Sequence, residues 1–152
     1  MEKLKEKIKN LNGQKVTIKS YKEITKFTSD KIDTYNKGGL FPNECRTNSQ
    51  AVARYLGDDA LVVEGFLVTA DKCFYPHMWV KYQNIYIDLT MELFNETFNS
   101  NKYYELMTHK NDNSNFPKEL LFSDYINKLL AEFHEENSEC KILYDELYDK
   151  LG

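Results

Sequence analysis

"HMWVKYQNIYIDLT", residues 77–90, decides the fold of this chain. Its two halves are rich in β-branched and aromatic residues, which is typical of β-strands. We expect one strand over residues 77–82 and another over residues 85–90, joined by the two-residue turn Gln83-Asn84. The stretch therefore predicts an antiparallel hairpin.

The short turn sets the register of this hairpin. If the strands pair directly across the turn, Trp79 faces Asp88. His77 then faces Thr90, and these four side chains share one face. His77 and Asp88 become diagonal neighbours about 7–8 Å apart between α-carbons, a distance that an imidazole and a carboxylate can bridge. The opposite face carries apolar side chains that suit a core, namely Met78, Val80, Ile85, Ile87 and Leu89.

Upstream of the hairpin, residues 44–56 repeat side chains at steps of three and four, which predicts a helix. Asn43 can cap the N-terminus of this helix, and Gly57 can end it. Cys45 shares a face with Val52, which places the thiol at the top of the buried stripe. We therefore expect this thiol where the core opens to solvent.

A carboxylate interrupts the apolar run between the helix and the hairpin. Residues 60–70 are rich in Val, Leu and Phe and predict a central strand, with Glu64 inside it. Because a buried carboxylate needs a partner, we expect a salt bridge from Glu64 to Arg46 or Arg54. His109 lies in polar surroundings and is interpreted as a surface residue.

Cys45, His77 and Asp88 have complementary chemistry. The free N–H groups and the dipole of a helix N-terminus stabilise a thiolate, and a nearby histidinium stabilises it further. Cys45 would be the nucleophile, His77 would take and return its proton, and Asp88 would orient the ring. N–H groups around Cys45 would stabilise an oxyanion, with Asn43 as the side-chain candidate. Trp79 is expected to pack against the His77–Asp88 contact and, secondarily, to form a wall of the substrate groove.

The order of these segments resembles a known family. A cysteine that opens a helix is followed by "VVEGF", "HMWV" and "YIDLT". This order resembles the core of transglutaminase-like proteins in the papain-like cysteine peptidase superfamily, in which a His-x-Trp strand and an Asp-bearing strand follow the cysteine helix. The spacing agrees, because His77 follows Cys45 by 32 positions and Asp88 follows His77 by 11. The resemblance covers residues 45–90.

This resemblance implies a papain-like α+β fold, with an N-terminally capped cysteine helix packed on an antiparallel sheet and helices at the C-terminus. It also implies Cys45, His77 and Asp88 as a catalytic triad. Similarity to arylamine N-acetyltransferases is weaker, because four or more residues separate Gly39 from Cys45 and their Arg-Gly-Gly-x-Cys element is not matched. No tryptophan directly follows the cysteine, so the chain does not resemble papain-type peptidases proper.

Length and composition indicate a single domain. With 152 residues, of which 41% are hydrophobic and 14% aromatic, the chain can form one core and is short for two domains. We expect one transglutaminase-like domain over residues 1–152. Its core would cover about 38–92, and a helical C-terminal extension would cover about 93–152.

Charge and cysteine content argue against several classes of function. The net charge of -4 comes from 24 acidic and 20 basic residues without a long basic run, which argues against a nucleic-acid partner. No segment reads as a signal peptide or a membrane span, so no membrane association is expected. Three cysteines far apart in sequence do not suggest a disulfide framework and suit a reducing compartment. The sequence thus predicts a cytoplasmic protein.

A metal site is the competing chemistry. Cys73 and His77 are spaced C-x3-H, and Cys45 and Asp88 are possible further ligands. The paired short spacings of structural zinc sites are missing, so we expect neither a metal nor another cofactor. Cys73 is then a spare loop thiol, and Cys140 a structural residue of the last helix.

Two functions follow from these residues. The first is a small thiol enzyme that forms an acyl-enzyme at Cys45 from an amide or ester of a peptide, a protein or a small molecule. Hydrolysis, deamidation and transamidation share this first half-reaction, and the sequence leaves the choice open. The alternative is a binding module that keeps the fold without catalysis and engages a protein partner through its C-terminal helices.

Overall fold

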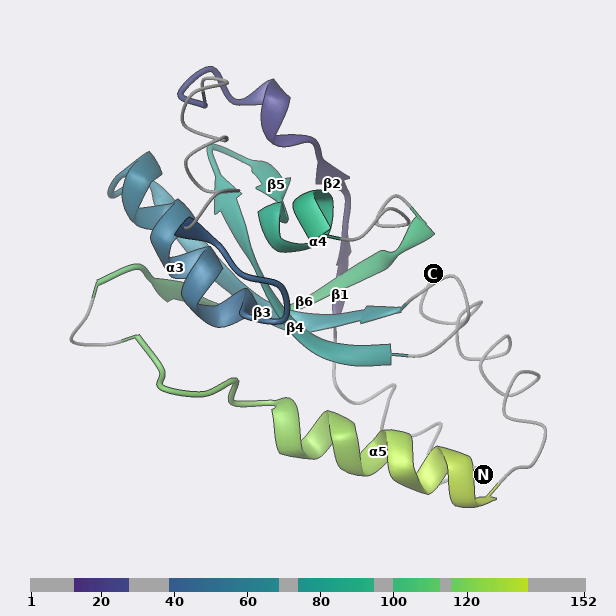
Figure 1. Cartoon of the computed structure of the whole chain (residues 1–152). Coiled ribbons are helices and arrows are strands. Elements are labelled where there is room, and N and C mark those ends of the chain that lie inside the picture. Colours follow the sequence, from purple (N-terminus) through teal and green to yellow (C-terminus); the bar gives the residue numbers. More distant parts are fainter. Residues whose placement is uncertain (1–12, 28–38, 69–73, 95–99, 113–115, 137–152) are drawn as a thin grey trace.

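The computed structural model describes residues 13–27, 39–68, 74–94, 100–112 and 116–136, and shows a mixed α+β fold with a curled six-stranded sheet (Figure 1). The elements in chain order are β1 (Gln14–Val16), β2 (Ile18–Lys19), the 3-10 helix η1 (Tyr21–Glu23), α3 (Cys45–Leu56), β3 (Ala60–Val68), β4 (Phe74–Tyr82), β5 (Ile85–Ile87), α4 (Leu89–Phe94), β6 (Lys102–Lys110) and α5 (Ser123–Glu136). The predicted α+β class is therefore correct.

The strand order explains why the sheet curls. The strands follow one another as β1-β6-β3-β4-β5-β2, so β1 and β2 lie at opposite ends of the order. Only Thr17 separates these two strands in the chain. Because one residue spans about 3.3 Å of extended chain, the two edges of the sheet must approach each other. Neighbouring strands are antiparallel except for β2 and β5, which are parallel.

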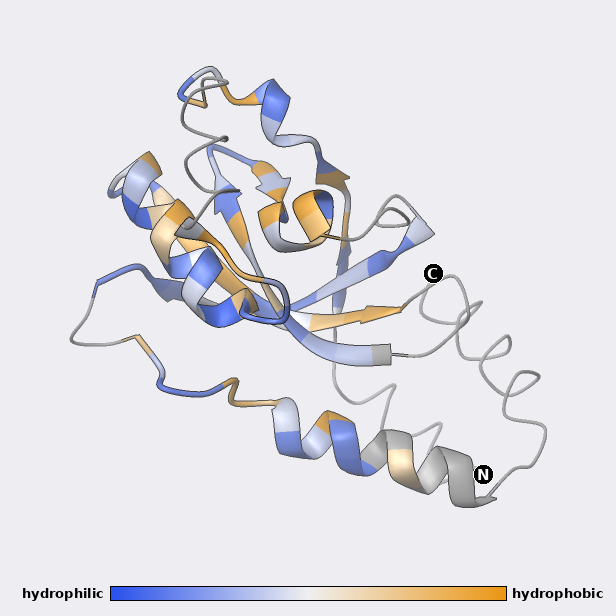
Figure 2. Cartoon of the chain, viewed as in Figure 1, coloured by the Kyte–Doolittle hydropathy of each residue, from blue (hydrophilic) through white to orange (hydrophobic). Residues whose placement is uncertain are grey.

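Both faces of β3 and β4 are buried. On one face α3 packs against a core that includes Val62, Met78 and Val80. On the other face Val63 and Trp79 belong to a second cluster inside the curl. Because both faces are covered, β3 needs no alternation of apolar and polar residues, and Figure 2 shows that the visible end of β3 at its arrowhead is hydrophobic.

The predicted hairpin register is confirmed. Val80 pairs with Ile87 and Tyr82 with Ile85, as the pairing across a two-residue turn requires. Gln83 and Asn84 have φ of 48° and 67°. Two central residues with positive φ are typical of the type I′ turn, whose twist matches that of antiparallel strands.

The second strand of the hairpin is shorter than predicted. We expected residues 85–90 to be extended, but β5 ends at Ile87 and α4 begins at Leu89. The backbone N–H of Met91 donates to Oδ1 of Asp88 over 3.2 Å. Asp88 thus satisfies a free donor of the first turn of α4, as an N-cap residue does, and this turns the chain out of the sheet.

The helix that carries Cys45 has the predicted length but not the predicted cap. It runs from Cys45 to Leu56 and ends at Gly57, which has a φ of 110°. Its N-cap is Glu44, and no side chain caps the helix by a hydrogen bond. The expected N-cap, Asn43, has a φ of 64°, whereas an N-cap residue is typically in the β-region. The prediction of an N-capped cysteine helix is therefore wrong in this respect.

The predicted helical extension contains a strand. Within residues 93–152, β6 pairs with β3 on one side and with β1 on the other. Its sequence "KYYELMTHK" mixes helix-forming Glu, Leu and Met with strand-forming Tyr and Thr, so local propensity does not decide the element. Burial of Tyr103 and Tyr104 in the sheet decides it. The helical pattern before residue 137 does form α5, and the last predicted helix, with Cys140, lies outside the described residues.

Gly65 allows β6 to lie close to β3. A Cβ atom on Gly65 would lie 2.0 Å from the carbonyl oxygen of Tyr104 and 2.8 Å from Cη2 of Trp79. The register of β3 and β6 shifts between Glu64 and Gly65. A residue without a side chain is therefore needed where the bulge brings the two backbones together.

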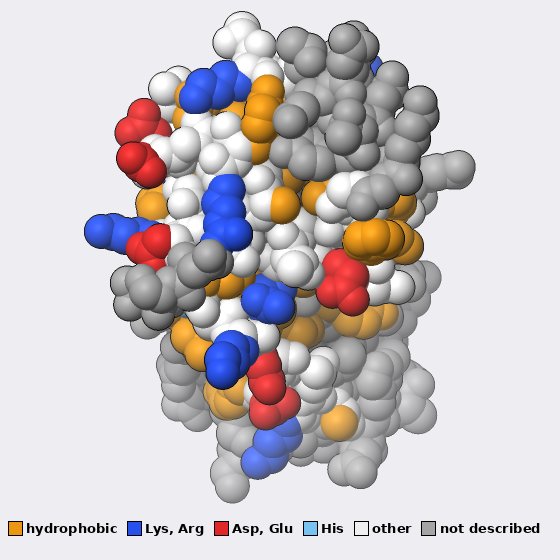
Figure 3. Space-filling view, turned by 60° about the vertical axis from the view of Figure 1, so that its left-hand side comes forward, with side chains coloured by type: hydrophobic (Ala, Val, Ile, Leu, Met, Phe, Trp, Pro, Cys, Tyr) orange, Lys and Arg blue, Asp and Glu red, His pale blue; other side chains and the backbone are white. Residues whose placement is uncertain are grey.

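The surface shown in Figure 3 carries both signs of charge. Lysine, arginine and acidic side chains are interspersed over this face among the described residues. Such mixing differs from the clustered basic patch of nucleic-acid-binding proteins. Among the helices described, none combines the length and the apolar character that crossing a membrane requires.

Candidate active site

The hairpin brings His77 and Asp88 into contact. Nε2 of His77 lies 2.7 Å from Oδ2 of Asp88. The two residues are 6% and 1% exposed, so this contact is shielded from water. His77 comes from β4, and Asp88 comes from the junction of β5 and α4.

Three donors surround the Asp88 carboxylate. Oδ2 accepts hydrogen bonds from the His77 ring and from the hydroxyl of Tyr103, the latter over 2.7 Å. Oδ1 accepts the backbone N–H of Met91. Both oxygens are thereby fixed in orientation, and the carboxylate in turn fixes the imidazole.

Tyr103 is a site residue that the sequence analysis missed. It lies on β6 and is 1% exposed. Burial, followed by the charge of Asp88 and the hydrogen bond to it, raises the pKa of the Tyr103 hydroxyl. The hydroxyl therefore keeps its proton and remains a donor. No sequence pattern indicated the strand that carries Tyr103, and its position becomes evident from the pairing of β6 with β3.

Asp88 and Cys45 keep the His77 ring protonated at neutral pH. Burial has the largest single influence and lowers the pKa of His77. The charge of Asp88, its hydrogen bond, and the hydrogen bond and charge of Cys45 together outweigh burial and raise this pKa from 6.5 to about 10. The ring thus lies between two groups that favour its cationic form.

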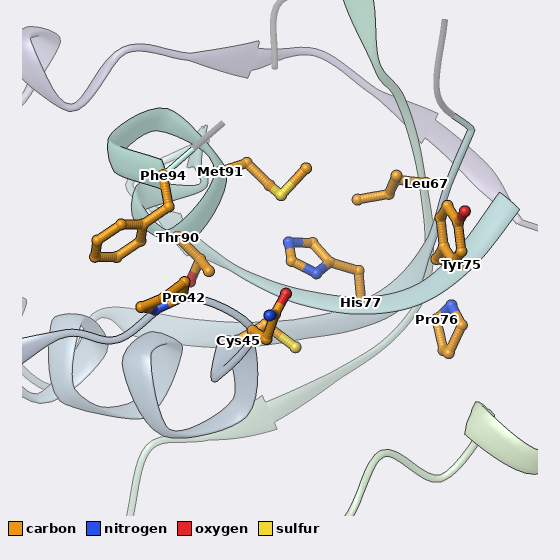
Figure 4. Close-up of a pocket in the computed structure, with 10 residues that line it drawn as sticks. Pro42, Cys45, Leu67, Tyr75, Pro76, His77, Thr90, Met91 and Phe94 are labelled. Atoms are coloured by element: carbon orange, nitrogen blue, oxygen red, sulfur yellow. The ribbon is translucent and has the colours of Figure 1, made fainter. Parts of the chain in front are cut away.

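Cys45 reaches His77 from the end of α3. It is the first residue of that helix, it is partly exposed, and it lies close enough to His77 to raise the pKa of the ring. Because Nε2 of the ring contacts Asp88, Nδ1 is the nitrogen left for the thiol. The structure therefore brings together the three residues that the sequence analysis selected, and Figure 4 shows Cys45 and His77 at one cavity.

The end of β5 makes this meeting possible. His77 shares the face of Trp79, whereas α3 packs on the opposite face of the sheet. Along β4, the described part of β5 pairs with residues 80–82 and with no others. The part of β4 around His77 therefore has β3 as its only strand partner among the described residues. The thiol can therefore approach the ring around this open edge.

A cavity of about 390 Å³ adjoins the thiol and the ring. It is lined by Pro42, Asn43, Cys45, Leu67, Tyr75, Pro76, His77, Thr90, Met91 and Phe94. Asn43, the side-chain candidate for the oxyanion site, thus lies in the cavity wall. Its backbone has left-handed geometry, with a φ of 64°.

Trp79 lies behind His77 rather than in the cavity wall. It is fully buried, and its ring stacks on the imidazole with centroids 6.1 Å apart and an interplanar angle of 23°. Tyr103 packs edge-on against Trp79 at 5.1 Å. This position matches the predicted packing role, and Trp79 is not among the residues that line the cavity.

Asn48 joins three segments beside the site. Its Nδ2 donates to the carbonyl oxygen of Phe41 over 2.7 Å and to Oγ1 of Thr90 over 3.1 Å. Its Oδ1 accepts the backbone N–H of Phe41 over 3.2 Å. The loop before α3, the helix itself and α4 are thereby linked by one buried amide. No role was assigned to Asn48 from the sequence.

A second imidazole–carboxylate pair corrects two predictions. Glu64 is fully buried, and its Oε1 lies 2.9 Å from Nε2 of His109, while its Oε2 accepts the backbone N–H of Phe122 over 2.8 Å. The expected salt bridge to Arg46 or Arg54 is not formed. Arg46 instead donates to the carbonyl oxygen of Pro117, and Arg54 donates to that of Asn111. His109 is partly buried rather than a surface residue, because the unpredicted strand β6 carries it beside β3.

Within the described ranges, no group of three or more His, Cys, Asp or Glu side chains is arranged to hold a metal ion. Cys73, the loop thiol of the metal alternative, lies outside those ranges. Comparisons of this chain with protein-family models, with curated proteins and with solved structures find no match. The function of this protein is therefore inferred from the geometry of the site.

Proposed function

We propose that this protein is a thiol enzyme that transfers or hydrolyses an acyl group through Cys45, His77 and Asp88. The observation that carries the proposal is the buried 2.7 Å contact between His77 and Asp88, on a ring that lines an open cavity together with Cys45 and whose pKa Cys45 helps to raise. Nucleophile, base and orienting carboxylate thus lie together in the order that covalent catalysis uses.

The proposed reaction begins with attack on the carbonyl carbon of an amide or ester. A sulfur–carbon bond forms, and the bond to the leaving amine or alcohol breaks. The cationic ring of His77 donates its proton to that leaving group, and Asp88 holds the ring in position. Water or an amine then attacks the thioester, loses a proton to His77 and releases Cys45 as the thiolate.

The N-terminus of α3 supports oxyanion stabilisation. No side-chain hydrogen bond caps this helix, and Cys45 is its first residue, so the thiol lies at the positive end of the helix dipole, beside the first-turn N–H groups. These donors suit the negative oxygen that forms when the carbonyl is attacked. Asn43, in the cavity wall, is the proposed side-chain donor.

We also propose that the fold is papain-like, of the transglutaminase-like type. Its support is the order of a cysteine helix, a His-x-Trp strand and an Asp residue after the next strand, together with the contacts among their functional side chains. We propose a cytoplasmic location from the wide spacing of the three cysteines. Peptides, proteins and small amides or esters are the proposed substrate classes.

The second candidate function is binding of a protein partner without catalysis. The observation that favours it is the exposure of two large apolar side chains at α5, Leu121 at 59% and Tyr125 at 40%. Exposed aromatic and aliphatic side chains of this kind are found at interaction surfaces. This candidate requires no reactivity of Cys45.

Alkylation by iodoacetamide at pH 6–7, followed by peptide mass mapping, separates the two functions. If the proposal is correct, Cys45 is labelled on the order of tenfold or more faster than Cys73 and Cys140. His77→Gln should remove this advantage. His109→Gln is the matched control, because it alters an imidazole–carboxylate pair without a thiol.

Equal labelling of all three cysteines would favour the binding function instead. Metal analysis of the purified protein provides an independent check. Zinc near one equivalent, lost in the Cys45→Ser variant, would overturn the catalytic assignment.

A further inference from the structure

The cavity beside Cys45 has the size of a small-molecule site. Its volume of about 390 Å³ lies within the range of roughly 300–1,000 Å³ that is typical of ligand pockets. Cys45 and His77 form part of its wall, so a molecule in the cavity would place a group directly beside the sulfur.

Most of the wall is apolar. Leu67 is 2% exposed and belongs to the core cluster of Trp79, against which Met91 also packs. Phe94 packs against the core on the helix face. Figure 4 shows these side chains around the imidazole of His77. The apolar part of the wall is therefore backed by the core, so it provides a preformed surface.

The described wall offers no charge to a substrate outside the catalytic pair. Besides Cys45 and His77, its polar side chains are Asn43, Thr90 and the hydroxyl of Tyr75, all of them neutral. A carboxylate or an ammonium group placed against this part of the wall, away from His77 and Cys45, would lose its hydration without gaining an opposite charge. A hydrocarbon group would gain from leaving water.

On the basis of the proposed function, we infer that the enzyme takes a neutral, hydrophobic acyl group. Its hydrocarbon part lies against Leu67, Met91 and Phe94, and its carbonyl carbon lies at the sulfur of Cys45. The acyl group becomes a thioester of Cys45 as the leaving group departs with a proton from His77. Water then attacks the thioester, gives a proton to His77 and releases a carboxylic acid with an uncharged chain, which restores the thiolate of Cys45.

The test uses the full-length protein and p-nitrophenyl esters of acetate, butyrate, hexanoate and the monoester of adipate. Release of p-nitrophenol gives kcat/KM, and intact mass with peptide mapping locates the acyl group. Each added methylene from acetate to hexanoate should raise kcat/KM about three- to fourfold. Adipate, which carries a carboxylate on a chain of the same length as hexanoate, should react at least roughly tenfold more slowly than hexanoate.

Met91→Lys tests the wall by weakening this preference for hexanoate over adipate. Only the backbone N–H of Met91 contacts Asp88, so the substitution leaves that hydrogen bond in place. A lysine there should narrow the hexanoate-to-adipate ratio by on the order of tenfold, because the carboxylate gains a partner. Leu106→Lys is the control, since Leu106 is also partly buried but does not line the cavity, and it should leave the ratio unchanged.

The outcomes distinguish this inference from the proposed function. If Cys45 is acylated in a His77-dependent manner but hexanoate and adipate react equally, the inference is overturned and the proposed function stands. If no ester acylates Cys45 faster in the wild type than in His77→Gln, both are overturned. A hexanoate preference that Met91→Lys does not alter would also sink the inference, because it would locate the acyl group elsewhere.

Discussion

Two buried contacts between an imidazole and a carboxylate lie on opposite faces of the same sheet. His77 meets Asp88 at 2.7 Å on the face of Trp79, and His109 meets Glu64 at 2.9 Å on the face of α3. Each carboxylate also accepts a backbone N–H. In these respects the two pairs are alike.

Their remaining neighbours differ. His77 lines a cavity together with Cys45, whereas His109 packs edge-on against the ring of Phe116 at 6.1 Å. Glu64 binds the residue that precedes α5, so this second pair fastens a helix to the sheet. The comparison teaches that an imidazole–carboxylate contact alone does not indicate catalysis. The third partner, a thiol or a backbone segment, decides its role.

The two pairs should differ most in their effect on the rate of the reaction. His77→Gln should lower kcat/KM for p-nitrophenyl hexanoate on the order of 10³-fold, because the thiol loses its acid and base. His109→Gln should change it less than about twofold, since that ring touches no reacting group. Comparable losses in both variants would show that the pairs do not have different roles.

The second pair should matter more for stability. Glu64→Ala leaves the N–H of Phe122 and the His109 ring without their acceptor inside the protein. We expect a loss of about 2–4 kcal/mol in the free energy of unfolding, measured by urea denaturation. A loss below about 0.5 kcal/mol would contradict the role of Glu64 in holding α5 to the sheet. Glu23→Ala, at an exposed site, serves as the control.

The first pair should make stability depend on pH. The pKa of His77 is raised from 6.5 to about 10, so folding favours the protonated ring. This contribution is fully present below pH 6.5 and is lost as the pH rises through about 10. The stability difference between wild type and His77→Gln should therefore shrink from pH 6 to pH 9.5. A stability difference that stays constant or grows over this pH range would refute the raised pKa of His77.

The smallest effect should come from the hydroxyl that supports Asp88. Tyr103→Phe removes one of three donors to that carboxylate and keeps the aromatic packing against Trp79. We expect a loss of about 1 kcal/mol in stability and a fall in kcat of less than roughly tenfold. An unchanged kcat together with unchanged stability would show that the hydroxyl does not help to hold the carboxylate.

The sequence was most informative where local rules act. The two-residue turn and the alternation of apolar side chains fix the pairing of Val80 with Ile87, and the hairpin register follows from them. Helical spacing likewise locates α3 to within one residue, with Gly57 at its end. These features depend on residues close together in the chain, so their physical causes can be read directly.

The sequence was least informative where distant segments meet. Tyr103 joins the site, and His109 joins the pair that holds α5 to the sheet, only because β6 pairs with β3. That pairing depends on tertiary burial rather than on local propensity. The predicted N-cap of α3 was wrong because the backbone of Asn43 has a left-handed conformation, which its residue type alone does not reveal. The sequence indicated Asp88 as the carboxylate that orients His77, but it did not indicate that Asp88 also caps α4.

The amide of Asn48 has a consequence for the shape of the cavity. It binds both Phe41, next to Pro42, and Thr90, and Pro42 and Thr90 line the cavity. A residue at position 48 without an amide would therefore release two segments of the cavity wall from each other, while the contact between His77 and Asp88 would remain. Substitution here would alter which molecules fit without removing a catalytic side chain.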